Sequence, residues 1–366
     1  MGKITVVVDY GRERGTGKWV CPAREGWGLG AHQKMTPELE DRVCLTATLT
    51  GSYQAAAELS AKWGSPVAVS TLRTHAGQVG RRAAAQAQER LKGPVAVELA
   101  AGALRPAPPG ALVIMMEGWL ARQRGPEWGG PSGGVLTKRI AWHEVKGAVI
   151  YRLAQAGQTA GGRGVIVQKY VVAWQGEPLE FGQRVQAEAC RRGLAEARAV
   201  FVVADGSVWI GNVQADRFGR AQGVLDFYHA SQHLWTVARA LHPEDAAAAR
   251  VWVEPLLSQL RHGQERGVLQ TLEDLPAWCA RQRGTVPPEV EREREYFQTH
   301  RDHLHYEAMA ARGCPVGSGA MESFCAQLQG RFKRCGQFWS PDGLGDLLAL
   351  DVARRNLDWD ALWSNN

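Results

Sequence analysis

The sequence predicts an α/β protein, with a sheet in its central part and helical segments before and after it. Apolar, strand-like runs recur between residues 111 and 228, and amphipathic helical segments separate the later runs. By contrast, residues 36–92 and 242–311 show helical patterns. We therefore expect two helical regions around one sheet-containing core.

Composition sets the limits of this prediction. The 366 residues are enough for two or three domains, and 45% apolar with 22% charged residues is ordinary for a globular protein. No run reaches the roughly 18 apolar residues of a membrane span, and the N-terminus lacks the apolar core of a signal peptide. Seven scattered cysteines without a CxxC pair argue against a disulfide framework or zinc ribbon. We expect a cytoplasmic protein with no membrane partner.

Charge favours a polyanionic partner. The formal net charge is +6, and arginine heavily outnumbers lysine. Arginine suits bidentate phosphate contacts, although a GC-rich genome would produce the same enrichment in Ala, Gly and Arg.

The chain divides into six segments of different character. They are a Gly- and Trp-rich β segment (1–35), three helices (36–92), a proline-containing linker (93–110), the sheet-forming part (111–241), a charged helical part (242–311), and a C-terminal helix and tail (312–366).

The helices of 36–92 have the outline of a helix-turn-helix DNA-binding domain. Gly51 and Gly64 separate them, and Thr36 and Ser52 are predicted N-caps. Residues 69–79 would be the recognition helix, with Arg73 facing DNA, and a further helix would follow over 81–91. An ordinary helical hairpin is an equally good interpretation.

The strand order within 111–228 indicates one core architecture. Strands are predicted at 112–116, 141–151, 164–174, 199–205 and 223–228, with a helix near 184–196. Three strands, a helix, a strand, a helix and a strand is the order of an RNase H-like core, whose first three strands form an antiparallel meander. Several other α/β folds fit the same order.

Three acids fall where backbone geometry could bring them together. Glu117 follows the first strand, Asp205 ends the fourth, and Glu322 lies one turn into the helix of "GSGAMESF". Two divalent metal ions about 3.5–4 Å apart require such a cluster of oxygen ligands. Taken singly, each acid has an ordinary reading, as a strand-to-helix turn or as a solvated helix surface.

Histidines offer a competing interpretation. His229 and His233 have the i, i+4 spacing of zinc ligands, but the first lacks a neighbouring glutamate and no third ligand is evident. We therefore interpret Asp226 and His229 as groups that lie beside the acid cluster. The histidine-rich stretch 299–307 is predicted to be a polar helix face or a phosphate contact.

Four blocks of sequence resemble one family. "WHEVKGAVIYRL", "VVADGSVWIGN", "ADRFGRAQGVLDFYHASQHLW" and "PVGSGAMESFCAQLQGRFKRCGQFWS" are similar to bacterial insertion-sequence DDE transposases of the ISKra branch, which are related to Mutator-like transposases. The resemblance runs from about residue 111 to the C-terminus, and more loosely through the helix-turn-helix. It implies an RNase H-like catalytic core with a helical insertion before the last acid.

The resemblance also implies an activity and partners. These are cleavage and strand transfer of double-stranded DNA, at terminal inverted repeats and target DNA, with two Mg²⁺ ions for which Mn²⁺ can substitute. The resemblance further implies a homodimer or larger homo-oligomer and a bacterial, nucleoid-associated location. By position, Asp205 matches the second catalytic aspartate and Glu322 the final glutamate, while Asp226 and His229 match an acid-x-x-His pattern. The alternative is that Asp226 is itself the second metal ligand.

Glu117 stands where the family has its first catalytic aspartate. Its extra methylene moves the carboxylate by about 1.5 Å, and a misplacement of about 1 Å can cost on the order of a hundredfold in rate. Asp9 in "VVVDYGRERG" is an alternative first acid. A DNA-binding descendant that has lost catalysis and a structure-specific nuclease are the alternative functions.

Basic residues around the acids are predicted DNA contacts, with a solvated charged face as the ordinary reading. Besides Arg73 they are Arg122, Arg124, Lys138 and Arg139 around the first strand, and Arg331, Lys333 and Arg334 after Glu322. Phe338 and Trp339 could stack on a displaced base, although core packing is the first expectation.

Overall fold

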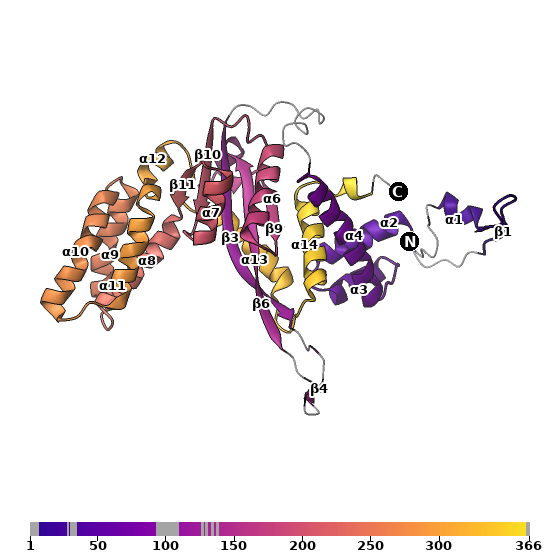
Figure 1. Ribbon diagram of the computed structural model, residues 1–366, viewed down its shortest axis with the longest axis horizontal. Helices are drawn as coiled ribbons and strands as arrows, with labels where there is room; N and C mark the ends of the chain where they lie inside the picture. Colours follow the sequence, from indigo (N-terminus) through magenta and orange to yellow (C-terminus); the bar gives the residue numbers. More distant parts are fainter. Residues whose placement is uncertain are drawn as a thin grey trace.

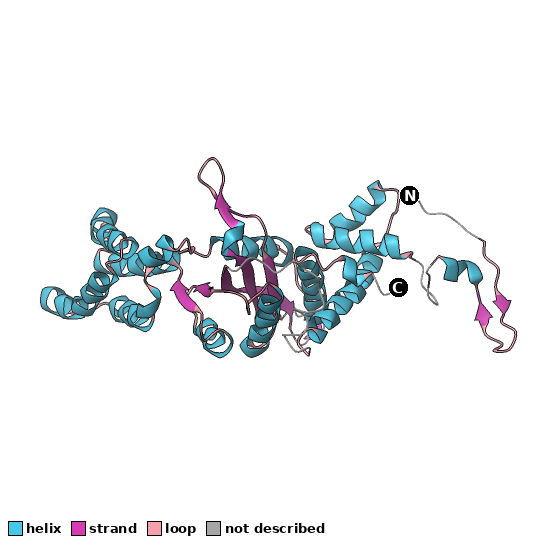
Figure 2. Cartoon of the chain, turned by 90° about the horizontal axis from the view of Figure 1, so that it is seen from above, coloured by secondary structure: helices cyan, strands magenta, loops and turns pink. Residues whose placement is uncertain are grey.

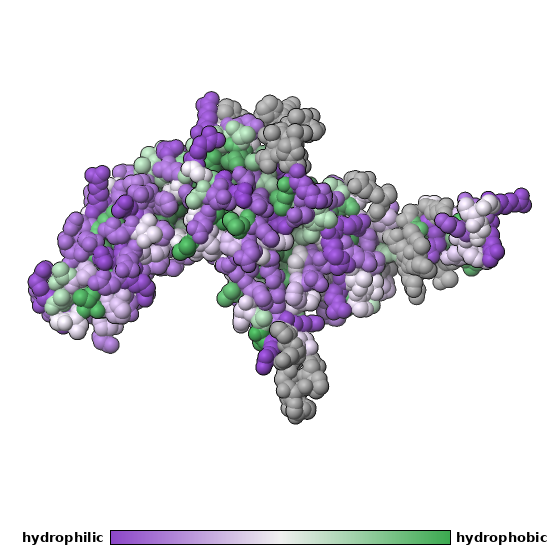
Figure 3. Space-filling model, viewed as in Figure 1, coloured by the Kyte–Doolittle hydropathy of each residue, from purple (hydrophilic) through white to green (hydrophobic). Residues whose placement is uncertain are grey.

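A mixed sheet lies at the centre of the chain, between two groups of helices (Figure 1). The computed structural model describes residues 7–27, 29, 35–92, 110–125, 128, 131–132, 135–136 and 139–363. The helices of residues 227–311 stand at one end of the sheet and those of residues 37–89 at the other. Within the described ranges no helix combines the length and apolarity needed to cross a membrane, and the face seen in Figure 3 is mainly hydrophilic.

The central sheet has five strands in the order β11-β10-β3-β6-β9. They are β3 (Ala111–Arg124), β6 (Ile140–Arg152), β9 (Tyr170–Trp174), β10 (Ala199–Ala204) and β11 (Gln222–Leu225). β3, β6 and β9 run antiparallel in turn, whereas β10 pairs in parallel with both β3 and β11. The predicted antiparallel order of the first three strands is therefore observed.

Two strand predictions need correction. β3 does not end at Met116 but continues for eight residues to Arg124, because β6 supplies backbone partners from Gly147 to Ile140 beyond the point where β10 ends. The run predicted as one strand over 164–174 is divided, because β8 (Gly164–Ile166) pairs instead with β7 (Ala156–Gln158).

Successive side chains of β3 point to opposite faces of the sheet, and each face has its own hydrophobic core. Leu112, Ile114 and Met116 pack with α6 (Pro178–Arg191) and α7 (Val208–Arg217). Val113 and Met115 join the larger core on the opposite face, to which α13 (Gly319–Phe332) and α8 (Phe227–Leu241) contribute. Figure 2 shows the sheet enclosed between these helices. α6 begins six residues before its predicted start, with a proline in its first turn, where the missing N–H has no helical partner to lose.

The N-terminal helices are α2 (Pro37–Leu49), α3 (Tyr53–Lys62) and α4 (Val69–Glu89). Both predicted N-caps are confirmed, because Thr36 accepts from the Leu39 amide and Ser52 from the Ala55 amide. The predicted break between helices at residues 79–81 is wrong, since α4 is continuous. Its Gly80 packs against the backbone of Asp346 in α14 (Pro341–Arg355), where no larger residue fits.

The segment from 242 to 311 is helical, as predicted. It contains α9 (Ala246–Arg261), α10 (Glu265–Arg283), α11 (Pro288–Thr299), the 3₁₀ turn η2 (Arg301–His303) and α12 (Tyr306–Ala311).

Short elements complete the description. They are β1 (Gly11–Arg12), β2 (Trp19–Val20), α1 (Pro22–Gly26), β4 (Pro131–Ser132), β5 (Val135–Leu136), η1 (Leu153–Gln155) and η3 (Asp360–Leu362). The strand expected in "ITVVV" lies mostly outside the described residues, as does the linker 93–110 except for Gly110.

We expect Gly80→Ala to lower the free energy of unfolding by about 1–3 kcal/mol, the usual cost of overpacking, because the new methyl group would collide with the Asp346 backbone. Gly211→Ala is the matched control, since nothing lies within 4 Å of a Cβ at this position in α7. The control should gain up to about 1 kcal/mol from helix propensity. Denaturant unfolding measures both, and equal midpoints for the two variants would contradict the close α4–α14 packing.

Candidate active site

The register of two parallel strands places the first two acids side by side. β10 pairs with β3 up to Ala204 and Met116, so Asp205 and Glu117 are the next residues on neighbouring strands. Along β3, Glu117 shares a face with Met115 and Trp119, both of which belong to the larger core. The Glu117 side chain therefore points to the face that α13 covers.

Contacts opposite Glu117 confirm how closely α13 approaches. Gly147 is the antiparallel partner of Glu117 in β6, and a Cβ added there would lie 2.6 Å from Cε of Met321 in α13. The next residue of α13 is Glu322, which is exposed. α13 thus carries the third acid to the same face of the sheet.

Asp226 ties the beginnings of two helices together. It is fully buried, and its Oδ1 accepts from the amides of Tyr228 and His229 at 2.6 and 3.0 Å, which caps α8. Its Oδ2 accepts from the amide of Ser318, just before α13. Three backbone donors occupy this carboxylate, which favours a positioning role for Asp226 over the alternative that it is a metal ligand.

The pKa of Glu117 is changed by its burial and by its neighbours. Burial raises the pKa of its carboxyl group, and the charges of Asp205 and Glu322 raise it further, whereas a hydrogen bond from Cys325 and the charge of His229 lower it. Burial also raises the pKa of the Cys325 thiol, and the nearby Glu117 carboxylate adds to this effect. Asp205 and Glu322 are therefore both within electrostatic reach of Glu117.

One carboxylate oxygen at this site lacks a partner. Glu117 Oε2 is buried and accepts no hydrogen bond within the described structure. An unsatisfied buried carboxylate oxygen is costly, and a divalent cation would satisfy it. Carboxylate oxygens are the ligands that Mg²⁺ and Mn²⁺ prefer, so the donor chemistry fits those ions.

The three acids do not form a closed metal site as they stand in the described structure. Among the described residues, no three His, Cys, Asp or Glu side chains are grouped closely enough to hold one metal ion. Asp205 accepts from the Ser207 amide and hydroxyl, each at 2.8 Å. His229 and His233 belong to no such group among the described residues, and His233 Nδ1 bonds to Glu293 Oε2 at 2.5 Å.

Asp9, the alternative first acid, is exposed, and the described residues before it, Val7 and Val8, are not in a strand. It does not have the strand-end position that the alternative requires.

Two of the predicted DNA contacts make hydrogen bonds within the protein, and one of them is buried. Arg331 is only 7% exposed, donates to the Ala47 carbonyl and lies over Tyr53 and Trp339, so its assignment as a DNA contact is corrected. Arg122 donates to the Arg334 carbonyl at the end of α13, where a cation is favourable.

The other basic residues differ in position. Arg73, Arg124, Arg139 and Arg334 are exposed, Lys333 is half-buried, and Lys138 lies outside the described residues. Trp339 is buried and donates to the Phe332 carbonyl at 2.8 Å, which confirms the core-packing expectation. Phe338 is half-buried and packs on Trp128.

Two residues at the site were missed from the sequence. Cys325 bonds to Glu117, and Tyr296 of α11 donates to the backbone oxygen of Asp205 at 2.8 Å. Cys325 could have been predicted, because its i, i+3 spacing from Glu322 places both on the same side of one helix. For Tyr296 the sequence held no local signal.

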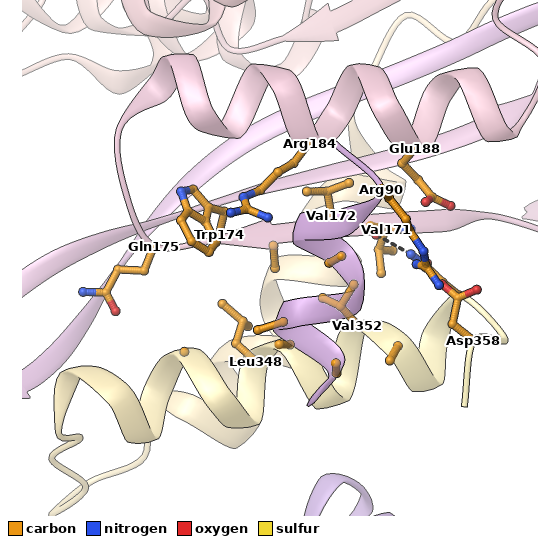
Figure 4. A pocket seen from close by; sticks show the side chains of 18 of the residues that line it. Arg90, Val171, Val172, Trp174, Gln175, Arg184, Glu188, Leu348, Val352 and Asp358 are labelled. Carbon is orange, nitrogen blue, oxygen red and sulfur yellow. Dashed lines mark hydrogen bonds and ion pairs between the residues drawn. The ribbon is translucent and has the colours of Figure 1, made fainter. Parts of the chain in front are cut away.

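A pocket of about 390 Å³ lies elsewhere, between α4, β9, α6 and α14 (Figure 4). Val172, Leu348 and Val352 are among its apolar wall residues, and one end is closed by the ion pair of Arg90 with Asp358 at 2.8 Å. None of the three acids lines this pocket, so it is separate from the candidate site.

No family model matches the chain, and no curated protein matches it. Among solved structures, the Drosophila P element transposase strand transfer complex is similar with a TM-score of 0.41 and 11% identity, over 92% of this chain and 96% of that chain. A likeness of this size supports no conclusion about what the chain does.

We expect Glu117→Gln to stabilise the metal-free protein at neutral pH. Because the folded-state pKa of Glu117 is raised, the stability linked to its protonated form is fully present below the ordinary glutamate pKa and is lost as pH rises through the folded-state pKa. The gain should be of the order of 1 kcal/mol at pH 7 and vanish below about pH 4.

Denaturant unfolding in EDTA between pH 4 and 8 measures this difference. Glu244→Gln, at an exposed position, should change stability little at any pH. A destabilised Glu117→Gln at pH 7 would contradict the buried, unsatisfied carboxylate.

Proposed function

We propose that this chain is a DDE transposase of the ISKra branch, which cuts and joins double-stranded DNA at terminal inverted repeats. Glu117, Asp205 and Glu322 would hold two Mg²⁺ ions, with Mn²⁺ as a substitute. The observation that carries the proposal is the strand register that sets Glu117 beside Asp205, on the face to which α13 brings Glu322.

The sheet topology supports an RNase H-like core. Such a core requires an antiparallel meander of three strands, with two further strands added in parallel beside the first. The order β11-β10-β3-β6-β9 has this arrangement, and its first strand carries Glu117. Helices α9–α12 would be the insertion before the last acid.

The chemistry follows from these positions. When bound, the metal ions would activate a water or a 3′-hydroxyl and stabilise the leaving oxygen. Asp205, between the other two acids in this proposal, would contact both ions, while Glu117 and Glu322 would each hold one. No side chain is required as a nucleophile.

Basic residues on the β3–β6 hairpin and at the end of α13 would hold the DNA backbone. Arg124 and Arg139 lie on the long β3–β6 hairpin, and Lys333 and Arg334 lie at the end of the helix that carries Glu322. Phosphate contacts of this kind bind DNA without reading its sequence.

The N-terminal helices would bind the terminal repeats as a helix-turn-helix. On α4, Val69, Ser70, Arg73 and Thr74 are exposed together on one side. On the inner side, His75 bonds to Glu40 of α2 at 2.5 Å, which fixes α4 against the bundle. A helix with one fixed and one exposed polar face suits the major groove.

The second candidate function is a DNA-binding descendant of a transposase without catalytic activity. It is favoured by the glutamate at position 117, by the hydrogen bond of its carboxylate to Cys325, and by the spacing of the acids. A structure-specific nuclease is a third possibility on the same core. Strand transfer distinguishes the transposase from the nuclease.

We expect the unaltered chain to cleave a terminal-repeat duplex in Mg²⁺ or Mn²⁺. Asp205→Asn should lower the cleavage rate at least about 100-fold, because losing a metal ligand should cost more activity than losing a residue that only supports a ligand. Asp216→Asn, at an exposed site in α7, is the matched control and should cleave normally. Gel assays of nicked and joined products measure both steps. Cleavage that survives Asp205→Asn would exclude the proposed site, and cleavage by Glu117→Asp alone would identify a catalytically silent descendant.

For the DNA-binding face, we expect Arg73→Ala to weaken binding to the terminal repeat and to reduce the slope of log K against log salt by about 1 if Arg73 contacts a phosphate. Arg250→Ala provides the control, because Arg250 is an exposed arginine of α9 that pairs with Glu254. Fluorescence anisotropy over a salt series measures both slopes. Equal effects of the two substitutions would show that the exposed face of α4 makes no specific contribution to DNA binding.

A further inference from the structure

The helical insertion reaches back over the turn that carries Asp205. The Tyr296 hydroxyl of α11 donates to the Asp205 backbone oxygen at 2.8 Å. A Cβ added to Gly206 would lie 2.8 Å from His300 Nε2 and 2.9 Å from the Tyr296 hydroxyl oxygen. Gly206 has a φ of +86°, which a side chain would also disfavour. Two insertion side chains therefore enclose this turn closely.

Tyr296 is itself held in place by contacts with residues of α8 and α11. The His233 ring of α8 stacks on the Tyr296 ring, with centroids 3.7 Å apart and planes 19° from parallel. His233 Nδ1 bonds to Glu293 Oε2, and Glu293 is 2% exposed and pairs with Arg292 at 2.7 Å. The position of the hydroxyl is thus fixed by neighbours on two helices.

The turn is restrained on both sides of Asp205. Ser207 holds the carboxylate oxygens through its amide and hydroxyl, and Tyr296 holds the backbone carbonyl of the same residue. We propose that Tyr296 is a positioning residue for Asp205, through which the helical insertion fixes the direction of that carboxylate. This inference rests on the proposed function of Asp205.

The expected effect follows from the geometry. Without the Tyr296 hydroxyl, the Asp205 carbonyl loses its hydrogen bond, and only Ser207 and His300 still hold the turn around Gly206. Glycine itself offers little backbone resistance to movement. Since displacement by about 1 Å can cost on the order of a hundredfold, a partly freed turn should lower the cleavage rate about tenfold or more. DNA affinity should stay the same, because Tyr296 is not a DNA contact in this proposal.

Tyr296→Phe tests this role, because it removes only the hydroxyl and keeps the ring that stacks on His233. Tyr306→Phe is the matched control. Tyr306 is likewise a tyrosine of the insertion, more deeply buried than Tyr296, but its hydroxyl has no hydrogen-bond partner within the described structure. Two readouts are needed. One is amide hydrogen exchange at residues 206–208 in metal-free protein, and the other is the single-turnover cleavage rate at saturating terminal-repeat DNA.

In Tyr296→Phe, exchange at residues 206–208 should accelerate several-fold and the cleavage rate should fall, while the unfolding midpoint stays close to that of the control. In Tyr306→Phe neither readout should change. Unchanged exchange in Tyr296→Phe, equal acceleration in both variants, or faster exchange with an unaltered cleavage rate would each overturn the inference. If the unaltered chain does not cleave DNA, the proposed function fails, and hydrogen exchange alone decides whether Tyr296 holds the turn.

Discussion

The parallel pairing of β3 with β10 is the constraint on which the candidate site depends. After the pair Met116–Ala204, β10 turns through Gly206 into α7, whereas β3 continues alongside β6. Glu117 and Asp205 are therefore adjacent at the point where the two chains separate. A slip of one residue in the register of β3 would turn Glu117 to the opposite face of the sheet, away from α13.

The carboxyl group of Asp226 extends this constraint to the third acid. By accepting from backbone amides at the beginnings of both α8 and α13, it fixes the helix that carries Glu322 relative to the sheet. The buried Glu117 carboxylate that results is unfavourable for folding, as its raised pKa and its unpartnered oxygen indicate. Such a group is consistent with a functional role, since active sites commonly hold groups that destabilise the fold.

Local patterns were sufficient to predict much of this fold. The caps at Thr36 and Ser52, the five strand runs and the acids beside them are encoded within a few residues each. Several errors involve partners far away in the sequence. The continuity of α4 depends on the contact of Gly80 with α14, and the burial of Arg331 depends on its contact with Ala47 in α2. Likewise, the contact of Tyr296 with Asp205 exists only once the insertion has folded back.

The most direct test of the central claim is the position of Mn²⁺ in crystals of the protein soaked with that ion, located by its anomalous scattering. We predict Mn²⁺ within about 2.5 Å of carboxylate oxygens of Asp205 and of Glu117 or Glu322, allowing for ligand distances slightly longer than those of Mg²⁺. Mn²⁺ bound elsewhere, with these three carboxylates free of metal, would contradict the proposed site.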